Sequence, residues 1–235
     1  SDRIGRKPVM LAGFALAALT YFPIFHGITH FANPKLEQAL ASAPVTVTAD
    51  PSECSFQFKA TGTEKFTTGC DNIKSVLVNL SVNYDNVAAP KGTLASVKIG
   101  EQVVPADTPN LAAAIAAAVK SHGYPASADP NEINFVMTVL LLTILVIYVT
   151  MVYGPIAAWL VELFPTRIRY SGLSLPYHIG NGWFGGFLPA TVFAIVAATG
   201  NIYSGLWYPI AVAIMSFVIG LFFLPETKDR DITKI

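Results

Sequence analysis

One polar stripe interrupts an otherwise apolar stretch and carries the residues best suited to chemistry. Ser174, His178, Asn181 and Gly185 follow one another at i, i+4, i+7 and i+11, so a helix would place them on one side. An imidazole titrates near neutral pH, and His178 could therefore take up and release a proton. The alternative is a neutral histidine that is hydrogen-bonded to a neighbouring helix.

The stripe belongs to one of four segments that are long enough to cross a bilayer as helices. A span needs about 20 apolar residues, and residues 8–29, 134–161, 171–198 and 206–224 contain no Asp, Glu, Lys or Arg. Only 13% of the 235 residues are charged, about half the usual share of a soluble domain, and the mean hydropathy is +0.51. The sequence predicts a mainly α-helical, multi-pass membrane protein.

Between the first and second spans lies a polar insert that holds 17 of the 30 charged residues. We therefore divide the chain into residues 1–29, which hold a charged loop and the first span, an insert at 30–133, and a final part at 134–235 with three spans and a tail. The chain starts within a charged loop without an initiator methionine, so we expect it to be the C-terminal piece of a longer protein.

Lysine and arginine in the short connections predict the orientation. Four spans put both termini and the 162–170 loop on the same side, and the 199–205 loop, on the other side, has no Lys or Arg. The termini are therefore predicted to be cytoplasmic and residues 30–133 extracytoplasmic. The cations on the cytoplasmic side are Arg3, Arg6, Lys7, Arg167, Arg169, Lys228, Arg230 and Lys234.

Both cysteines lie in the insert, at Cys54 and Cys70. Outside the cytoplasm such a pair is expected to be oxidised. Folding residues 54–59 back on 65–70 about Gly62 as a hairpin would set the two cysteines opposite each other. The sequence predicts a disulfide in this hairpin, and two unpaired thiols are the alternative.

The rest of the insert predicts a small α+β domain. Residues 71–81 fit either a helix capped by Asp71 or a strand, and 93–104 fit a hairpin that turns near Gly100. A helix should follow, with Thr108 as its cap, Pro109 in its first turn and Gly123 at its end. A shift of 40 residues aligns Tyr84 with Tyr124, which suggests two copies of a hairpin–helix unit and favours a helix at 71–81.

Several function classes are excluded by what the sequence lacks. Fifteen basic and fifteen acidic residues leave no net charge to attract nucleic acid. No metal-ligand spacing, nucleophile motif or phosphate loop is present. We expect no enzyme activity, no catalytic residue, no metal and no cofactor.

The charged segments beside the spans resemble motifs of the major facilitator superfamily of secondary transporters. Asp2-Arg-x-Gly-Arg-Lys7 is similar to the repeated loop motif of that superfamily, and Glu162-x6-Arg169 and Pro225-Glu-Thr-Lys228 resemble its sugar-porter pattern. The stretch from Glu162 to Ser174 is most similar to the metabolite:proton symporter branch. The resemblance implies that the spans are helices nine to twelve of a twelve-helix fold. It does not cover most of the insert, since the loop between helices nine and ten is short in that family.

The resemblance also implies a gate at the cytoplasmic ends of the helices. In it, Asp2 would accept from a helix N-terminus, Arg3 or Arg6 would pair with a carboxylate, Glu162 would pair with Arg169 or Arg167, and Glu226 would pair with a loop cation. The alternative is that Arg3, Arg6 and Lys7 only fix the topology.

The resemblance makes the second span helix ten, which lines the central cavity in that family, and the polar stripe of the third span adds the other candidates for a substrate and proton pathway. Its candidate residues are Tyr148, Tyr153, Ser174, His178 and Asn181. The two tyrosines could offer hydroxyls to a substrate, or they could pack against a neighbouring helix.

The implied function is proton-coupled symport of a small organic metabolite by alternating access in an inner or plasma membrane. Its partners would be the substrate, H+, the lipid bilayer and the N-terminal half of the transporter. Two alternatives stay open: a membrane-anchored module whose extracytoplasmic domain binds a ligand or partner, and an inactive truncated transporter.

Overall fold

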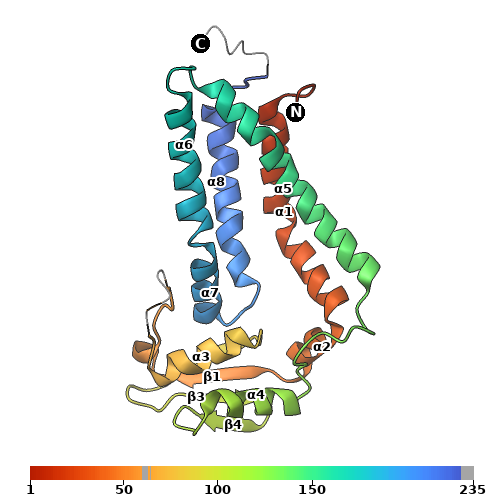
Figure 1. Cartoon of the computed structure of the whole chain (residues 1–235). Helices are drawn as coiled ribbons and strands as arrows, with labels where there is room; N and C mark the ends of the chain where they lie inside the picture. The colour runs from red at the N-terminus through yellow and green to blue at the C-terminus, as the bar shows by residue number, and fades with distance from the viewer. Residues whose placement is uncertain (60–62, 64, 229–235) are drawn as a thin grey trace. The chain divides into compact units, whose positions relative to one another are not determined.

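The computed structural model of the chain describes residues 1–59, 63 and 65–228 (Figure 1). Gly62, the expected turn of the cysteine hairpin, and the tail cations Arg230 and Lys234 lie outside the described residues.

Four long apolar helical segments confirm the predicted spans, and the protein is a multi-pass membrane protein. Each is at least 20 residues long and holds an uncharged or nearly uncharged apolar window, which is enough to cross a bilayer. The first two are α1 (Arg6–Ala32) and α5 (Phe135–Leu163). The third joins α6 (Arg169–Ile179), the π-helical turn η2 (Gly180–Gly185) and α7 (Leu188–Thr199). The fourth joins η3 (Ser204–Leu206) and α8 (Trp207–Phe223).

The chain forms two compact units. The first contains Ser1–Ile24, Val139–Leu188 and the residues from Trp207 onward, and the second contains Phe25–Thr138 and Pro189–Leu206. In the first unit α1 packs closely against α5 at Gly13. A Cβ at this position would lie only 2.9 Å from the Val152 side chain. Glycine therefore permits an approach that a larger residue would block.

A four-stranded sheet with the strand order β2-β1-β3-β4 organises the second unit. The strands are β1 (Val45–Ala49), β2 (Asp85–Ala88), β3 (Ser96–Ile99) and β4 (Gln102–Pro105). Strands β3 and β4 form the predicted hairpin, with Gly100 at a φ of +57° between them. Strands β1 and β2 are parallel, which requires a crossover, and α3 (Gly69–Asn79) supplies it.

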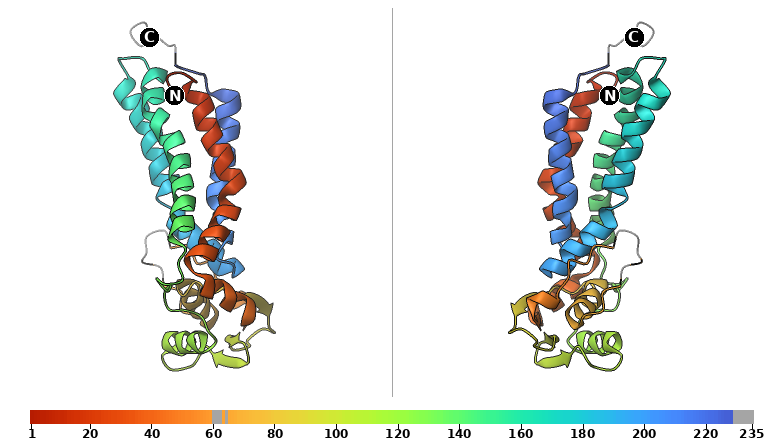
Figure 2. Two further views of the ribbon diagram at one scale, coloured as in Figure 1. Left: turned by 90° about the vertical axis from the view of Figure 1, so that its right-hand side faces the viewer. Right: turned by 90° about the vertical axis from the view of Figure 1, so that its left-hand side faces the viewer.

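The core of the second unit lies between one face of this sheet and two helices. Alternate residues of β1 are buried, as a period of two dictates. They pack with Ile73 and Leu77 of α3 and with Ile115 of α4 (Leu111–Ser121). The insert also contains the short helices α2 (Pro34–Ser42) and η1 (Pro51–Glu53). Figure 2 shows the strands and short helices of the insert packed side by side in both views. The fold class, a mainly helical membrane protein with a small α+β insert, is confirmed.

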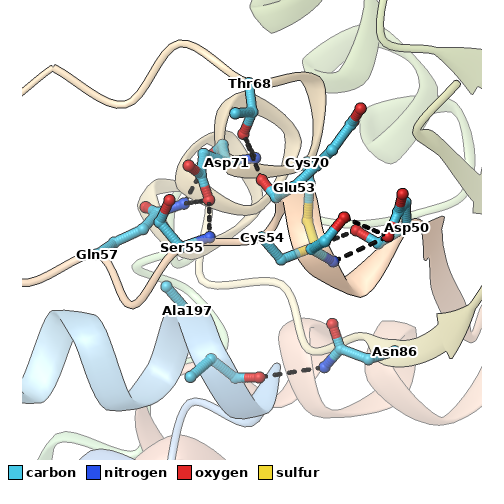
Figure 3. The surroundings of a disulfide bond; sticks show 12 residues. Asp50, Glu53, Cys54, Ser55, Gln57, Thr68, Cys70, Asp71, Asn86 and Ala197 are labelled. Carbon is cyan, nitrogen blue, oxygen red and sulfur yellow. Dashed lines mark hydrogen bonds between the residues drawn. A yellow bond between two sulfur atoms is a disulfide. The ribbon is translucent and has the colours of Figure 1, made fainter. Parts of the chain in front are cut away.

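Cys54 and Cys70 are joined in a disulfide, with 5.3 Å between their Cα atoms (Figure 3). The expected hairpin around them is wrong, because the described residues at 54–59 and 65–67 form no strand and Cys70 lies in the first turn of α3. The helix cap is also different. Thr68, and not Asp71, accepts from a helix N–H, while the Asp71 carboxylate accepts from the Ser55 N–H at 2.8 Å.

The predicted repeat is only partly present. Both helices exist, at 69–79 and 111–121, but residues 85–88 form a strand whereas 125–128 form none. The cap position of α4 is held by Asn110 and not by Thr108, and the Asn110 side chain makes no capping hydrogen bond. The Thr108 hydroxyl donates to the carbonyl of Pro105 at 2.7 Å. Gly123 does follow the helix, with a φ of +88°.

Residues 83–86 of the insert bind the C-terminal end of α7. The Tyr84 hydroxyl donates to the Ala197 carbonyl at 2.6 Å, and the Tyr84 N–H donates to the Gly200 carbonyl at 2.8 Å. The Asn86 amide donates to the carbonyls of Ala198 and Thr199. The last carbonyls of a helix have no partner within it, so the insert supplies the donors that α7 lacks.

We predict that Tyr84→Phe loosens this attachment. The hydroxyl is buried, and its removal leaves the Ala197 carbonyl without this donor, which should cost about 1–2 kcal/mol. Guanidinium unfolding of the chain in detergent micelles measures the loss, and amide hydrogen exchange at 197–202 should become faster. Tyr170→Phe is the control, because Tyr170 is 86% exposed. Equal stability of the two variants would contradict the prediction.

Candidate functional site

A cluster of charged residues joins the ends of α1, α5 and α8 in the first unit. Its centre is an ion pair between Arg6, at the start of α1, and Glu162, at the end of α5, with 2.9 Å between Nη2 and Oε1. Both side chains are largely buried, with 13% and 14% exposed. Arg6 also pairs with Asp2, and the Thr227 hydroxyl donates to Glu162 at 2.6 Å. We call Asp2, Arg6, Lys7, Glu162, Glu226 and Thr227 the charged cluster.

Glu226 binds the N-terminus of α1. Its carboxylate accepts from the backbone N–H groups of Arg6 and Lys7 at 2.9 and 3.0 Å. Partial burial of the carboxyl opposes ionisation, but these donors and those of Thr227 and Lys228 outweigh it and hold the pKa of Glu226 below its ordinary value. A negative charge is also favoured there by the helix dipole.

Lys7 binds the C-terminal end of a helix, α8. Its ammonium donates to the carbonyls of Leu221 and Leu224, both at 2.8 Å, where α8 ends. Trp159 of α5 donates to the nearby carbonyl of Pro225 at 3.2 Å. The charged cluster therefore ties three helices together, and Figure 2 shows their ends gathered near the N-terminus.

The pairing inside the cluster differs from the one expected. Glu162 pairs with Arg6 and not with Arg169 or Arg167. Arg169 turns back to donate to the Phe164 carbonyl at 3.2 Å, and Arg167 is exposed without an ion pair to any described residue. In the connection after α5, Arg167 lies in a turn at 166–168, and Arg169 is already the first residue of α6.

Asp2 and Glu226 also exchange the roles expected of them. Asp2 accepts from the Arg6 side chain, which lowers the pKa of Asp2, whereas Glu226 takes the helix N-terminus. This follows from the start of α1 at Arg6, which leaves Asp2 outside the first turn. The expectation that Arg3 or Arg6 would meet a carboxylate holds for Arg6. The backbone carbonyl of Arg3 accepts from the Lys228 ammonium at 3.3 Å.

A second feature of the first unit is a cavity of about 270 Å³ between α1, α5, η2 and α8. Its walls are mostly apolar, but four tyrosines line it, and we call it the tyrosine cavity: Tyr21, Tyr148, Tyr153 and Tyr208. The Tyr153 hydroxyl donates to the Asn181 amide oxygen at 3.3 Å. The Tyr208 hydroxyl donates to the Phe184 carbonyl at 2.9 Å, and Tyr148 accepts from Thr20 at 3.2 Å.

The structure brings together only some of the expected pathway residues. Tyr148 and Tyr153 line the tyrosine cavity, and Asn181 meets Tyr153 at it. His178 lies on an exposed part of α6, with its ring 5.9 Å from that of Tyr177, and Ser174 is half-buried on the same helix. The π-helical turn η2 starts at Gly180 and changes the helical period between His178 and Asn181. Gly185, at the end of the expected stripe, lines the tyrosine cavity.

Sequence reasoning missed several members of these two sites. From the sequence, no role is assigned to Tyr21, Tyr208 or Thr227, and Lys7 is treated only as part of the loop motif and as a topology signal. The Pro-Glu-Thr-Lys pattern contains Thr227, so the motif itself was the available signal for that residue. Among the described residues no group of His, Cys, Asp or Glu could hold a metal ion.

Comparison with known proteins decides the family. The family model described as "Sugar (and other) transporter" matches residues 110–235, which is more than half of the chain. The chain belongs to this family of transporters. The match takes in the end of the insert, the last three spans and the tail, and it does not include α1 or the rest of the insert.

Two curated relatives from Haemophilus influenzae carry the name "Putative metabolite transport protein". One is 49% identical over 82 residues, which cover 33% of this chain and 17% of the relative. The other is 38% identical over 89 residues, which cover 36% of this chain and 19% of the relative. The aligned part thus spans less than a fifth of each relative. No solved structure gives a significant match.

We predict that Glu162→Gln destabilises the first unit by about 2 kcal/mol. The substitution leaves the largely buried guanidinium of Arg6 without its full countercharge, and hydrogen bonds to charged groups contribute about 1.5–3 kcal/mol. Thermal or denaturant unfolding in detergent micelles measures the effect. Glu101→Gln is the matched control, because that side chain is 99% exposed. If both variants unfold like the parent chain, the pair does not hold the helix ends together.

Proposed function

We propose that the chain is the C-terminal part of a secondary active transporter that moves a small organic metabolite together with a proton by alternating access. In this proposal the spans are helices nine to twelve, and helices one to eight precede Ser1 in the whole protein. The termini are cytoplasmic, residues 30–133 are extracytoplasmic, and the membrane is the inner or plasma membrane. The transporter family of the chain supports the proposal.

The observation that carries the mechanism is the charged cluster. It links helices that are far apart in the sequence, α1, α5 and α8, through the Arg6–Glu162 pair and the Glu226 contact with a helix N-terminus. A transporter of this type has two conformations, and contacts made in only one of them set the balance between the two. We assign the cluster to one of them, the state in which the cytoplasmic side is closed.

The tyrosine cavity is the proposed substrate contact of this half. Phenol hydroxyls can donate to or accept from a polar metabolite, while the apolar walls exclude water around it. The Tyr153–Asn181 hydrogen bond places two such groups next to each other. A substrate hydroxyl could replace that bond by accepting from the Tyr153 hydroxyl and donating to the Asn181 amide oxygen, so that neither side chain is left unpaired.

Uptake by the whole protein tests the proposal. The whole protein, which is this chain together with the coding sequence upstream of Ser1, is expressed and reconstituted into proteoliposomes. Uptake of radiolabelled glucose, succinate and citrate is then measured. We expect saturable uptake of at least one of them and about a tenfold change in its rate in Glu162→Gln, because about 1.4 kcal/mol shifts a two-state balance tenfold. Glu101→Gln should transport like the parent. Absence of eight upstream spans would refute the transporter assignment, and unchanged uptake in Glu162→Gln would refute the role of the cluster.

Proton coupling is tested at His178. We expect His178→Ala to abolish the accumulation of substrate driven by an imposed pH gradient, while downhill exchange of labelled substrate continues, because only the coupled proton is lost. His122→Ala, in the insert, is the control. Undiminished pH-driven accumulation in His178→Ala would remove this residue from the proton pathway.

A further inference from the structure

The second unit contains a cavity that the transport proposal does not use. It measures about 240 Å³ and lies between β1, β2, the start of the disulfide segment and the end of α7. Its walls are mostly small apolar side chains: Val47, Ala49, Pro51, Val87, Ala88 and Ala198. Figure 3 shows part of this neighbourhood, with Cys54 and Asn86, which also line the cavity.

A lysine with an unusual environment lines this cavity. Lys74 of α3 is only 7% exposed, so nine-tenths of it is buried. Within the described residues its ammonium has no hydrogen bond and no ion pair, yet its nitrogen is not among the polar atoms sealed from solvent. It is therefore a buried cation that is reached from the cavity.

The charge nearest to Lys74 on its own helix does not neutralise it. Asp71 lies one turn earlier, and its Oδ1 accepts from the Ser55 N–H and the Gln57 amide. Its Oδ2 is buried without a hydrogen-bond partner in the described part of the chain, and the carboxylate forms no ion pair with Lys74 there. Burial lowers the pKa of Lys74, and the charge of Asp71 only partly opposes this. A buried ammonium without a partner is costly, and a bound anion would remove that cost.

The other residues that line the cavity, and its volume, limit which anions could bind there. The Asn86 amide already donates to the carbonyls of Ala198 and Thr199, so Lys74 is the donor left for a ligand. The other contacts are apolar and would bury a short hydrocarbon body. The volume is smaller than that of most sites for drug-sized ligands, about 300–1,000 Å³. These features fit a small carboxylic acid.

We propose that this cavity binds a small organic carboxylate, with the carboxylate on Lys74 and the apolar part against β1 and β2. Apart from Ala198 of α7, the lining residues belong to the part of the insert that the family model does not match. Binding here does not depend on transport, and it can be measured on the chain as it is.

Calorimetric titration of the chain in detergent micelles tests the site with benzoate and with its neutral analogue benzamide. We expect saturable binding of benzoate that is at least tenfold tighter than that of benzamide. Lys74→Met keeps the length and apolar stem of the side chain and should weaken benzoate binding at least tenfold. Lys91→Met, at an exposed lysine, should bind like the parent.

A second variant fills the cavity without changing the charge. Ala88 lies on β2 at the cavity wall, and Ala88→Leu should weaken benzoate binding while Lys74 remains. This variant decides the question if Lys74→Met does not fold. No saturable benzoate binding, equal affinity for benzamide, or full affinity in Lys74→Met or Ala88→Leu would each overturn the proposal.

Discussion

The polar groups at the ends of helices are the constraint on which this structure depends. A helix leaves its first N–H and last C=O groups without partners, and hydrocarbon supplies none. In the first unit charged side chains provide these partners: Glu226 takes the N–H groups where α1 begins, and Lys7 takes the carbonyls where α8 ends. The Arg6–Glu162 pair then joins α1 to α5. The sequence motifs are therefore solutions to the ends of particular helices.

The second unit meets the same constraint with neutral groups. Tyr84 and Asn86 donate to the final carbonyls of α7, and Asn83 accepts from the Ile202 N–H at 2.8 Å. Gly200 allows this close approach, because its φ is +80° and a Cβ there would lie 2.0 Å from the Tyr84 carbonyl oxygen. The insert is thus attached to the third span by backbone groups that the helix cannot satisfy itself.

The parts that could be predicted from sequence are those set by local patterns. The uncharged runs predicted the spans, Gly100 predicted the turn of the β3–β4 hairpin, and the apolar period predicted the helix at 111–121.

Partners far apart in the chain could not be predicted. Glu162 meets Arg6, 156 residues away, because helix packing and not sequence spacing brings them together. The parallel pairing of β1 and β2 was missed for the same reason. The pairing of Cys54 with Cys70 was predicted correctly, but the hairpin expected around them was wrong. A spacing of 16 residues also allows a disulfide to a cysteine in the first turn of a helix.

The two solutions to helix ends differ in how easily they can be undone. Arg6 and Glu162 are largely buried, at 13% and 14% exposure, but both are charged and lie at helix ends, so each can take up water or another charged partner when the pair separates. The hydroxyl of Tyr84 belongs to a residue with only 4% exposure and bonds a backbone carbonyl, so its separation leaves neutral groups unsatisfied. The two attachments therefore differ in the partners that can replace them: water or another charge can replace a partner at the charged cluster, whereas the Tyr84 contact joins buried neutral groups. We expect the insert to stay fixed to the end of α7 while the helix ends at the cluster exchange partners.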